Sequence, residues 1–201
     1  NKTRFIPVDS EHFSIWYSIK NTKISNIKRI YLTASGGPFF HASKEKMKKI
    51  EFKDVLNHPN WKMGKKISID SSTMMNKVFE VIEAKNIFNL ELNKISILVH
   101  PKSYVHAIIN FNDGMIKIIA HETTMKIPIF NSLYNRSDKN YFNKNININF
   151  LNNLNLTKIN TGRFPLVKIL KKIPKKISLY ETVIVSANDE LVRSYISKKI
   201  N

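Results

Sequence analysis

The sequence predicts an α+β fold, and three observations support that prediction. Short apolar stretches typical of β-strands alternate with longer stretches whose apolar residues recur at helical spacing. An Asn-Asp-Gly turn at 112–114 separates two strand-like stretches, which is typical of a β-hairpin. The length of 201 residues suits one large domain or two small ones. We therefore expect an α+β domain, in which strands, helices and a hairpin pack together.

The first elements are expected before residue 70. Residues 5–8 form a short strand-like stretch, and 27–33 alternates imperfectly before Ser-Gly-Gly-Pro at 35–38, a strand-to-loop signal. The polar stretch 44–56 has a helical pattern, and 66–69 is predicted to be a short strand.

The middle of the chain carries the clearest patterns. Ser71 or Ser72 can cap a helix that runs to about Phe88, because apolar residues recur there at helical spacing. Strands are expected over 95–100, 105–111 and 115–120.

The last third changes in texture. Residues 131–160 are rich in Asn with apolar residues at alternate positions, so they fit either strands or a loosely packed linker. Stretches 164–172 and 188–199 have helical patterns. The texture divides the chain into a mixed part over 1–130, an Asn-rich linker over 131–163 and a helical part over 164–201.

The charge of the chain does not by itself define a partner. Lys and Arg number 33 against 15 Asp and Glu, a formal charge of +18, and nucleic-acid binding needs clustered basic residues. Only 5 of these 33 are Arg, the residue that favours bidentate contacts with phosphate or guanine, and the lysines are scattered. We expect no nucleic-acid partner; a basic nucleic-acid-binding module is the less favoured alternative.

The expected compartment follows from three absent features. The sequence has no Cys, which excludes a disulfide framework, a thiolate metal site and a Cys nucleophile. No apolar run approaches the roughly 18–20 residues that cross a bilayer, and residues 1–13 lack a signal-peptide core. We expect a cytoplasmic protein with no membrane partner. Its first residue is Asn rather than Met, which is typical of a fragment.

Asp9 and Glu11 are the first candidate metal ligands. In an extended segment, residues two apart point to the same side, so both carboxylates would lie together. Adjacent carboxylates repel unless a cation lies between them, and Mg²⁺ and Mn²⁺ prefer oxygen ligands. The alternative is a solvated turn in which Asp9 caps a helix, and the bare Asp-x-Glu pattern favours that alternative.

A second group of candidates lies around the helix expected over 71–88. Asn76 and Lys77 flank Glu80 at helical spacing, and Ser71 would lie at the helix N-terminus, where free N–H groups favour an anion. The group suits a phosphorylated, hydroxylated substrate with a metal. Spacing alone favours the alternative, a capped amphipathic helix with a surface Lys77–Glu80 ion pair.

Loops supply weaker candidates. Ser35-Gly36-Gly37 offers a hydroxyl and unobstructed N–H groups, although an ordinary tight turn is favoured. Trp61 and Met63 precede Gly64, which suits the hinge of a closing lid, although tryptophan is more often a core anchor. Three histidines are interpreted as structural: His100, His106 and His121.

Together these motifs resemble the 1-deoxy-D-xylulose 5-phosphate (DXP) reductoisomerase family. The matching stretches are PVDSEH (7–12), LTASGGPF (32–39), HPNWKMGKKISIDSSTMMNK (58–77), FEVIEAKNIF (79–88) and HPKSYVHA (100–107). Weaker matches are MKIPI (125–129), FPLVKIL (164–170) and TVIVSANDE (182–190). They occur in the family's order and cover most of the chain.

The resemblance implies a role for each matched position. Asp9, Glu11 and Glu80 would bind one Mg²⁺ or Mn²⁺, and Glu11 and Lys77 would be catalytic. The substrate would contact Ser10, Ser35, His58, Ser71, Asn76, Lys77 and Glu80. The lid loop would comprise Trp61, Met63 and Gly64, and Gly64 and Met125 would lie near NADPH.

The implied reaction joins an isomerisation to a reduction. The metal would act as a Lewis acid during carbon–carbon cleavage and rejoining, and NADPH would reduce the branched aldehyde to 2-C-methyl-D-erythritol 4-phosphate in non-mevalonate isoprenoid synthesis. The resemblance also implies a central catalytic and dimerisation domain with a mixed sheet over 1–130, a linker over 131–163 and the start of a helical C-terminal domain over 164–201. It further implies a sugar-phosphate substrate, a homodimer and a bacterial-type cytoplasmic enzyme.

The sequence departs from the family pattern in several places. The family's NADPH-binding domain precedes the PVDSEH motif, and no G-x-G-x-x-G occurs here, so we expect this chain alone not to reduce substrate. Val78 and Phe79 replace the usual Gly-Leu before Glu80, and 120–124 lacks the family's Gly-Glu-Pro-Asp. A degenerate, non-catalytic fragment is therefore the main alternative.

Overall fold

The protein contains two compact units, each made of two segments of the chain. The computed structural model describes residues 5–47, 49–58, 60–61, 63–134, 141, 147–176 and 178–200. Residues 1–35 and 93–158 form the first unit, called the sheet unit below. Residues 36–92 and 159–201 form the second, called the helical unit.

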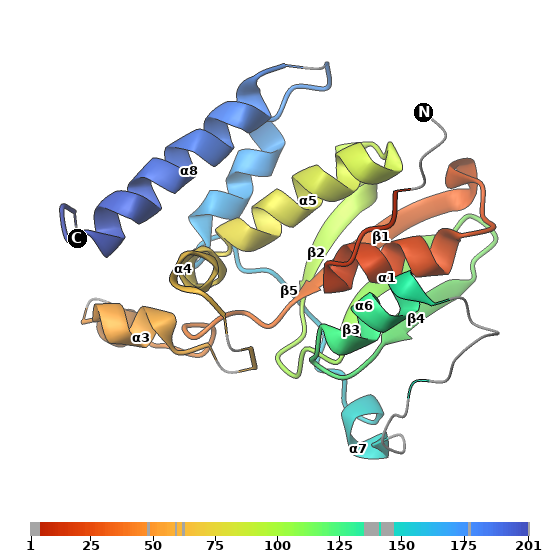
Figure 1. Cartoon of the computed structure of the whole chain (residues 1–201), viewed down its shortest axis with the longest axis horizontal. Coiled ribbons are helices and arrows are strands. Elements are labelled where there is room, and N and C mark those ends of the chain that lie inside the picture. The colour runs from red at the N-terminus through yellow and green to blue at the C-terminus, as the bar shows by residue number, and fades with distance from the viewer. Residues whose placement is uncertain are drawn as a thin grey trace. The chain divides into compact units, whose positions relative to one another are not determined.

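A five-stranded mixed sheet organises the sheet unit (Figure 1). The strands are β1 (Ile27–Ala34), β2 (Ile95–Val99), β3 (Val105–Phe111), β4 (Ile116–Ala120) and β5 (Thr157–Lys158), in the order β4-β3-β1-β2-β5. The β1–β2 pair is parallel, whereas the β1–β3, β3–β4 and β2–β5 pairs are antiparallel. The predicted α+β class is confirmed.

The Asn-Asp-Gly turn at 112–114 joins β3 to β4 in the predicted hairpin. Gly114 has φ +90°, a conformation that glycine adopts without a Cβ penalty. The N–H of Phe111 donates to the carbonyl of Met115 at 3.0 Å and closes the turn between β3 and β4.

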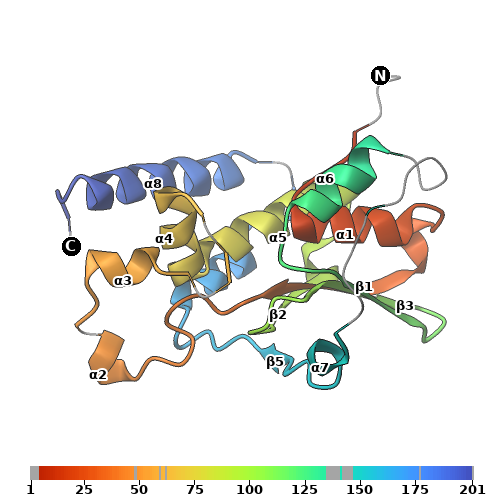
Figure 2. The same ribbon diagram turned by 60° about the horizontal axis from the view of Figure 1, so that its bottom comes forward.

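Helices lie on both sides of this sheet. α1 (Ser10–Ile19) and α6 (Lys126–Leu133) cover one side, and the short α7 (Ile148–Leu151) lies toward the other (Figure 2). α1 buries Phe13 and Ile15. Short 3₁₀ turns, η1 (Ile24–Asn26) and η2 (Leu92–Lys94), precede β1 and β2.

The described part of the helical unit contains no strand. Its elements are α2 (Lys44–Met47), α3 (Phe52–Leu56), α4 (Lys65–Thr73), α5 (Met75–Phe88), the 3₁₀ helix η3 (Pro165–Lys172) and α8 (Tyr180–Ile196). A core cluster consists of Phe39, Ala42, Val55, Ile69 and Val192.

The predictions for residues 44–88 were partly wrong. Residues 66–69 belong to α4 rather than to a strand, and 44–56 forms two short helices instead of one. Met74 adopts φ 64°, which ends α4, and α5 starts at the next residue and ends at the predicted Phe88. The helical interpretation of 164–172 agrees with η3, whereas 188–199 overlaps only the second half of α8, which begins at Tyr180 and ends at Ile196.

The Asn-rich stretch is only partly described. Residues 135–140 and 142–146 lie outside the described residues, and the rest of 131–160 contributes the end of α6, α7 and β5. The division into 1–130, 131–163 and 164–201 stays a prediction. Among the described residues, no helix combines the length and the apolar character that a bilayer crossing requires.

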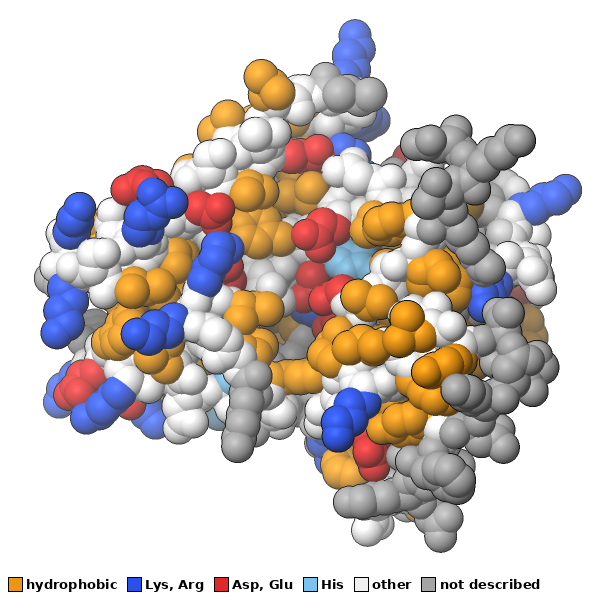
Figure 3. Space-filling model, in the orientation of Figure 1, with side chains coloured by type: hydrophobic (Ala, Val, Ile, Leu, Met, Phe, Trp, Pro, Cys, Tyr) orange, Lys and Arg blue, Asp and Glu red, His pale blue; other side chains and the backbone are white. Residues whose placement is uncertain are grey.

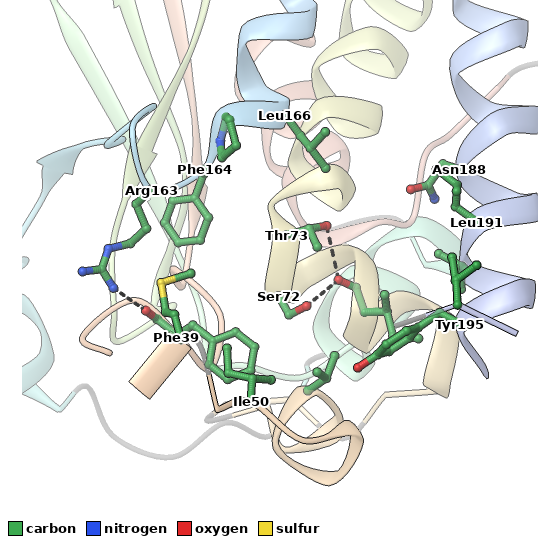
Figure 4. A pocket seen from close by; sticks show the side chains of 16 residues that line it. Phe39, Ile50, Ser72, Thr73, Arg163, Phe164, Leu166, Asn188, Leu191 and Tyr195 are labelled. Carbon is green, nitrogen blue, oxygen red and sulfur yellow. Dashed lines mark hydrogen bonds between the residues drawn. The ribbon is translucent and has the colours of Figure 1, made fainter. Parts of the chain in front are cut away.

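The helical unit contains an apolar pocket of about 470 Å³ (Figure 4). Phe39, Phe164 and Leu191 are among its lining residues. Arg163 in the pocket wall donates from its Nη1 to the backbone carbonyl of Phe39 at 2.7 Å. The Ser72 hydroxyl donates to the backbone carbonyl of Ile69, also at 2.7 Å. Because the lining is mainly apolar, the pocket does not suit a sugar phosphate.

Candidate metal and substrate site

Asp9 caps the N-terminus of α1. Its Oδ1 accepts the backbone N–H groups of Glu11 at 3.2 Å and of His12 at 3.4 Å. The His12 ring also lies 2.9 Å from this oxygen through Nδ1, while the Asp9 side chain remains 51% exposed. The strand predicted for 5–8 is absent, and the capped helix start that the sequence offered as an alternative is the one observed.

Glu11 lies in the first turn of α1. The buried Ser10 hydroxyl donates to its Oε2, which fixes the carboxylate beside the start of the helix. The N–H groups and the dipole at a helix N-terminus favour negative charge. Capping and the dipole together therefore favour two carboxylates, Asp9 and Glu11, at neighbouring positions of one chain segment.

His106 on β3 and His121 after β4 form a buried ring stack. Their centroids are 3.7 Å apart with an interplanar angle of 17°. Burial lowers the pKa of His121 below its usual value, partly offset by its hydrogen bond to the Glu122 carbonyl and by the charge of Glu11. Neither histidine was assigned a functional role from the sequence.

The helical unit places Glu80 between two donors of α5. Lys77 Nζ lies 2.5 Å from Glu80 Oε2, and Asn76 Nδ2 lies 2.5 Å from Glu80 Oε1. Both members of the ion pair are buried, with side chains 5% and 6% exposed. The predicted spacing is thus confirmed, but the pair is not the surface pair that the alternative required.

Ser71 occupies a different place from the predicted helix N-terminus. It lies within α4, before the Met74 break. Gly37 approaches its backbone so closely that a Cβ on Gly37 would lie 2.8 Å from the Ser71 carbonyl oxygen. The glycine at 37 therefore allows the turn to pack against α4 inside the helical unit.

The His58–Gly64 segment has no regular secondary structure in its described residues. The backbone N–H of Trp61 donates to His58 Nδ1 at 3.0 Å, and that of Asn60 donates to the same nitrogen at 3.2 Å. Burial lowers the pKa of His58. Because Nδ1 accepts both backbone N–H groups, the neutral ring carries its proton on Nε2. Trp61 and Met63 are half-buried, and Gly64 is exposed.

The remaining predicted residues divide between the two units. Ser35 follows β1 in the sheet unit and Met125 precedes α6 there. The sheet unit thus supplies Asp9, Ser10, Glu11, Ser35 and Met125, and the helical unit supplies His58, Trp61, Met63, Gly64, Ser71, Asn76, Lys77 and Glu80.

Sequence reasoning missed the contacts of two histidines. His12 is i+3 from Asp9 on α1, a spacing that could have flagged the pair once a helix was assumed. His121 had no such signal, because its contacts with His106 depend on the β3–β4 pairing.

Basic side chains do not gather in one patch on the visible face. Figure 3 shows Lys and Arg spread among acidic, apolar and neutral side chains. The expectation of no nucleic-acid partner stays a prediction.

Comparison with known families identifies the chain. A family model described as "1-deoxy-D-xylulose 5-phosphate reductoisomerase C-terminal domain" matches residues 5–88. Another, described as "DXP reductoisomerase C-terminal domain", matches residues 121–201. The chain belongs to the DXP reductoisomerase family. The resemblance inferred from the sequence is confirmed.

Relatives in the DXP reductoisomerase family match nearly the whole chain. The reductoisomerase of Pelagibacter ubique is 59% identical over 199 residues, which cover 99% of this chain and 51% of the relative. That of Aquifex aeolicus is 38% identical over 200 residues, covering 100% of this chain and 53% of the relative. The chain spans about half the length of the curated relatives it matches.

Solved DXP reductoisomerases share the fold. One, in complex with NADPH, fosmidomycin and magnesium, has a TM-score of 0.87 at 31% identity, over 97% of this chain and 50% of its own. The enzyme from Zymomonas mobilis, in complex with NADPH, has a TM-score of 0.85 at 33% identity, over 96% of this chain and 50% of its own.

Proposed function

We propose that this chain provides the divalent-metal and sugar-phosphate site of a DXP reductoisomerase. The observation that carries the proposal is the buried Glu80 held by Asn76 and Lys77. Burying a carboxylate and an ammonium costs desolvation free energy, so a buried ion pair is more often found at a functional site than kept for stability. The family resemblance supplies such a function for Glu80, that of a metal ligand.

The donor set fits a hard divalent cation. Asp9, Glu11 and Glu80 offer carboxylate oxygens, the ligands that Mg²⁺ and Mn²⁺ prefer. His12 and Ser10 hold the first two carboxylates in defined orientations. Bound there, the ion would supply Lewis-acid stabilisation of charge that develops on the substrate oxygens.

The chain's own residues would bind and enclose the substrate. Lys77 would contribute a positive charge, and the Nε2–H of His58 would donate to a phosphate or hydroxyl oxygen. Trp61 and Met63 would close over the substrate and exclude water. Substrate contacts are also proposed for Ser10, Ser35, Ser71 and Asn76.

Other parts of the proposal come from the resemblance and from the complexes of similar proteins. We propose NADPH as the hydride donor, contacted from this chain by Gly64 and Met125. A homodimer, manganese as the alternative metal, and a cytoplasmic location stay predictions. Sedimentation equilibrium of the chain tests the homodimer.

Calorimetric titration of the full chain with MnCl₂ tests the metal site. We expect one saturable site whose affinity falls at least about tenfold in Glu80→Gln, because one charged ligand is lost. Glu83→Gln is the matched control, since Glu83 is exposed on the same helix and is expected to leave affinity unchanged. Equal affinity in Glu80→Gln and in the unmodified chain would remove Glu80 from the ligand set.

A further inference from the structure

Asp70 of α4 is a buried residue, 3% exposed, and both of its carboxylate oxygens are paired. Its Oδ1 accepts from Asn188 Nδ2 of α8 at 2.8 Å, and its Oδ2 lies 2.8 Å from the Nζ of Lys66, four residues earlier on α4. The same ammonium lies 3.1 Å from Oδ1 of Asp189 on α8. These four side chains form one polar network inside the helical unit, called the α4–α8 network below.

The α4–α8 network opposes the intrinsic preferences of a helix. Lys66 lies in the first turn of α4 and Asp70 in the last, the reverse of the charge order that the helix dipole favours. A lysine that precedes its acidic partner by four residues is also the weaker order for a helical ion pair, and burial adds a desolvation cost. The network therefore does not serve the stability of α4 as a single helix. Its effect is to fix how α4 lies against α8.

That fixed orientation determines which way Ser71 points. Side chains four residues apart share one face of a helix, so Lys66 and Asp70 both face α8. Ile69, on one side of Asp70, packs in the same core cluster as Val192 of α8. Each residue of a helix is turned by about 100° from the one before it, so Ser71 is turned away from α8 on the other side.

Ser71 also differs from the other hydroxyl-bearing residues of α4. Ser68, Ser72 and Thr73 donate to backbone carbonyls three or four residues earlier, at 3.0, 2.7 and 3.3 Å, and the last two bonds are drawn in Figure 4. The hydroxyl of Ser71 bonds to no described residue, and the side chain is only half-buried. It therefore remains available to a ligand.

We propose that Asp70 and Asn188 are positioning residues for substrate binding. Without touching the substrate, they hold α4 in the rotation that presents the Ser71 hydroxyl to the sugar phosphate. Asp189 supports them through Lys66. This inference rests on the proposed function, in which Ser71 contacts the substrate, and it makes helix α8 a support of that contact.

Calorimetric titration of the full chain with DXP, in saturating MgCl₂, tests the proposal. Ser71→Ala is expected to weaken DXP binding about tenfold, because a hydrogen bond to a polar ligand is lost. Asn188→Ala is expected to weaken it about fivefold, because Ser71 is no longer held in place. Ser186→Ala, at an exposed position of α8, is the matched control and should leave the affinity unchanged.

A double-mutant cycle separates positioning from a general loss of structure. If Asn188 acts through Ser71, Asn188→Ala should change DXP affinity less than about 1.5-fold once Ser71 is already alanine. Asp189→Asn provides a second, milder variant, because the Asp189 side chain is 43% exposed. It is expected to weaken DXP binding about threefold in the unmodified background and to have no effect in the Ser71→Ala background. Circular dichroism checks that each variant is folded.

The outcomes distinguish this inference from the proposed function. Weaker binding in Ser71→Ala, with unchanged affinity in Asn188→Ala and Asp189→Asn, overturns the positioning role and leaves the substrate site intact. An effect of Asn188→Ala that is undiminished in the Ser71→Ala background also overturns it. Absence of DXP binding by the unmodified chain, or unchanged affinity in Ser71→Ala, overturns the proposed substrate contact and this inference together.

Discussion

Gly37 lies against the backbone carbonyl of Ser71, where a Cβ would be only 2.8 Å from the oxygen. Gly37 also has φ +67°, a conformation that side-chain-bearing residues rarely adopt. The contact joins the turn after β1 to the last turn of α4. Glycine is therefore required at 37 for two independent reasons.

Gly37→Ala is expected to lower the free energy of unfolding by about 2–4 kcal/mol, the sum of backbone strain and overpacking. Urea denaturation followed by circular dichroism measures the loss. Gly114→Ala is the matched control, because Gly114 has φ +90° but no atom within 4 Å of the added Cβ. Equal losses in the two variants would show that the approach to Ser71 contributes nothing.

The Lys77–Glu80 ion pair is expected to matter more than a surface pair. In Lys77→Met, Glu80 loses its cationic partner while remaining buried, so we expect a loss of about 3–5 kcal/mol in the metal-free chain. The exposed Lys53–Glu51 pair, with side chains 77% and 66% exposed, provides the comparison. Lys53→Met should cost less than about 1 kcal/mol, and a similar cost for both variants would contradict the buried-pair interpretation.

Local patterns predicted the elements whose signals are local. β1, β2 and the β3–β4 hairpin follow from alternation and from the Asn-Asp-Gly turn, and α5 ends at Phe88 as predicted. The same local reasoning failed at 66–69, where the apolar alternation in Lys-Ile-Ser-Ile resembles a strand. Helix α4 forms there instead, because tertiary contacts outweigh the local pattern: Ile69 packs in the core cluster with Val192 of α8, and Asn188 of α8 donates to Asp70.

The candidate site was predictable only where neighbours in sequence carry it. The spacing of Asn76, Lys77 and Glu80 predicts their contacts, and the sequence offered Asp9 as a helix cap. The His106–His121 stack depends on the register between two strands, which no local pattern specifies. The sequence pattern also did not predict that the Lys77–Glu80 pair is buried, because tertiary packing determines burial.

Asp70 is a buried carboxylate that joins α4 to α8. It lies 2.8 Å from Lys66 Nζ and accepts from Asn188 Nδ2 at 2.8 Å. Asn188→Ala removes one partner of a buried charge, so we expect a loss of about 1–3 kcal/mol in thermal or urea unfolding. Ser186→Ala, at an exposed position of α8, should change stability by less than about 0.5 kcal/mol. If Asn188→Ala is equally neutral, the bond to Asp70 does not hold α8.

His100 is expected to make the protein less stable in mild acid. Burial, chiefly, and the charge of Lys102 lower the pKa of His100, while its hydrogen bond to the Leu154 carbonyl opposes the shift. Because the folded-state pKa lies below the unfolded value of 6.5, the unfolded chain binds more protons between the two values. The contribution of His100 to stability is therefore complete above the unfolded pKa and is lost as the pH falls through the folded-state pKa.

Urea unfolding of the unmodified chain and of His100→Asn at a series of pH values measures this contribution. The unmodified chain should lose stability more steeply as the pH falls from about 7.5, because the asparagine side chain of the variant does not titrate. His58 and His121 also have lowered pKa values, so the variant is expected to keep part of the slope. Parallel curves for the two proteins would show that the protonation of His100 is not linked to folding.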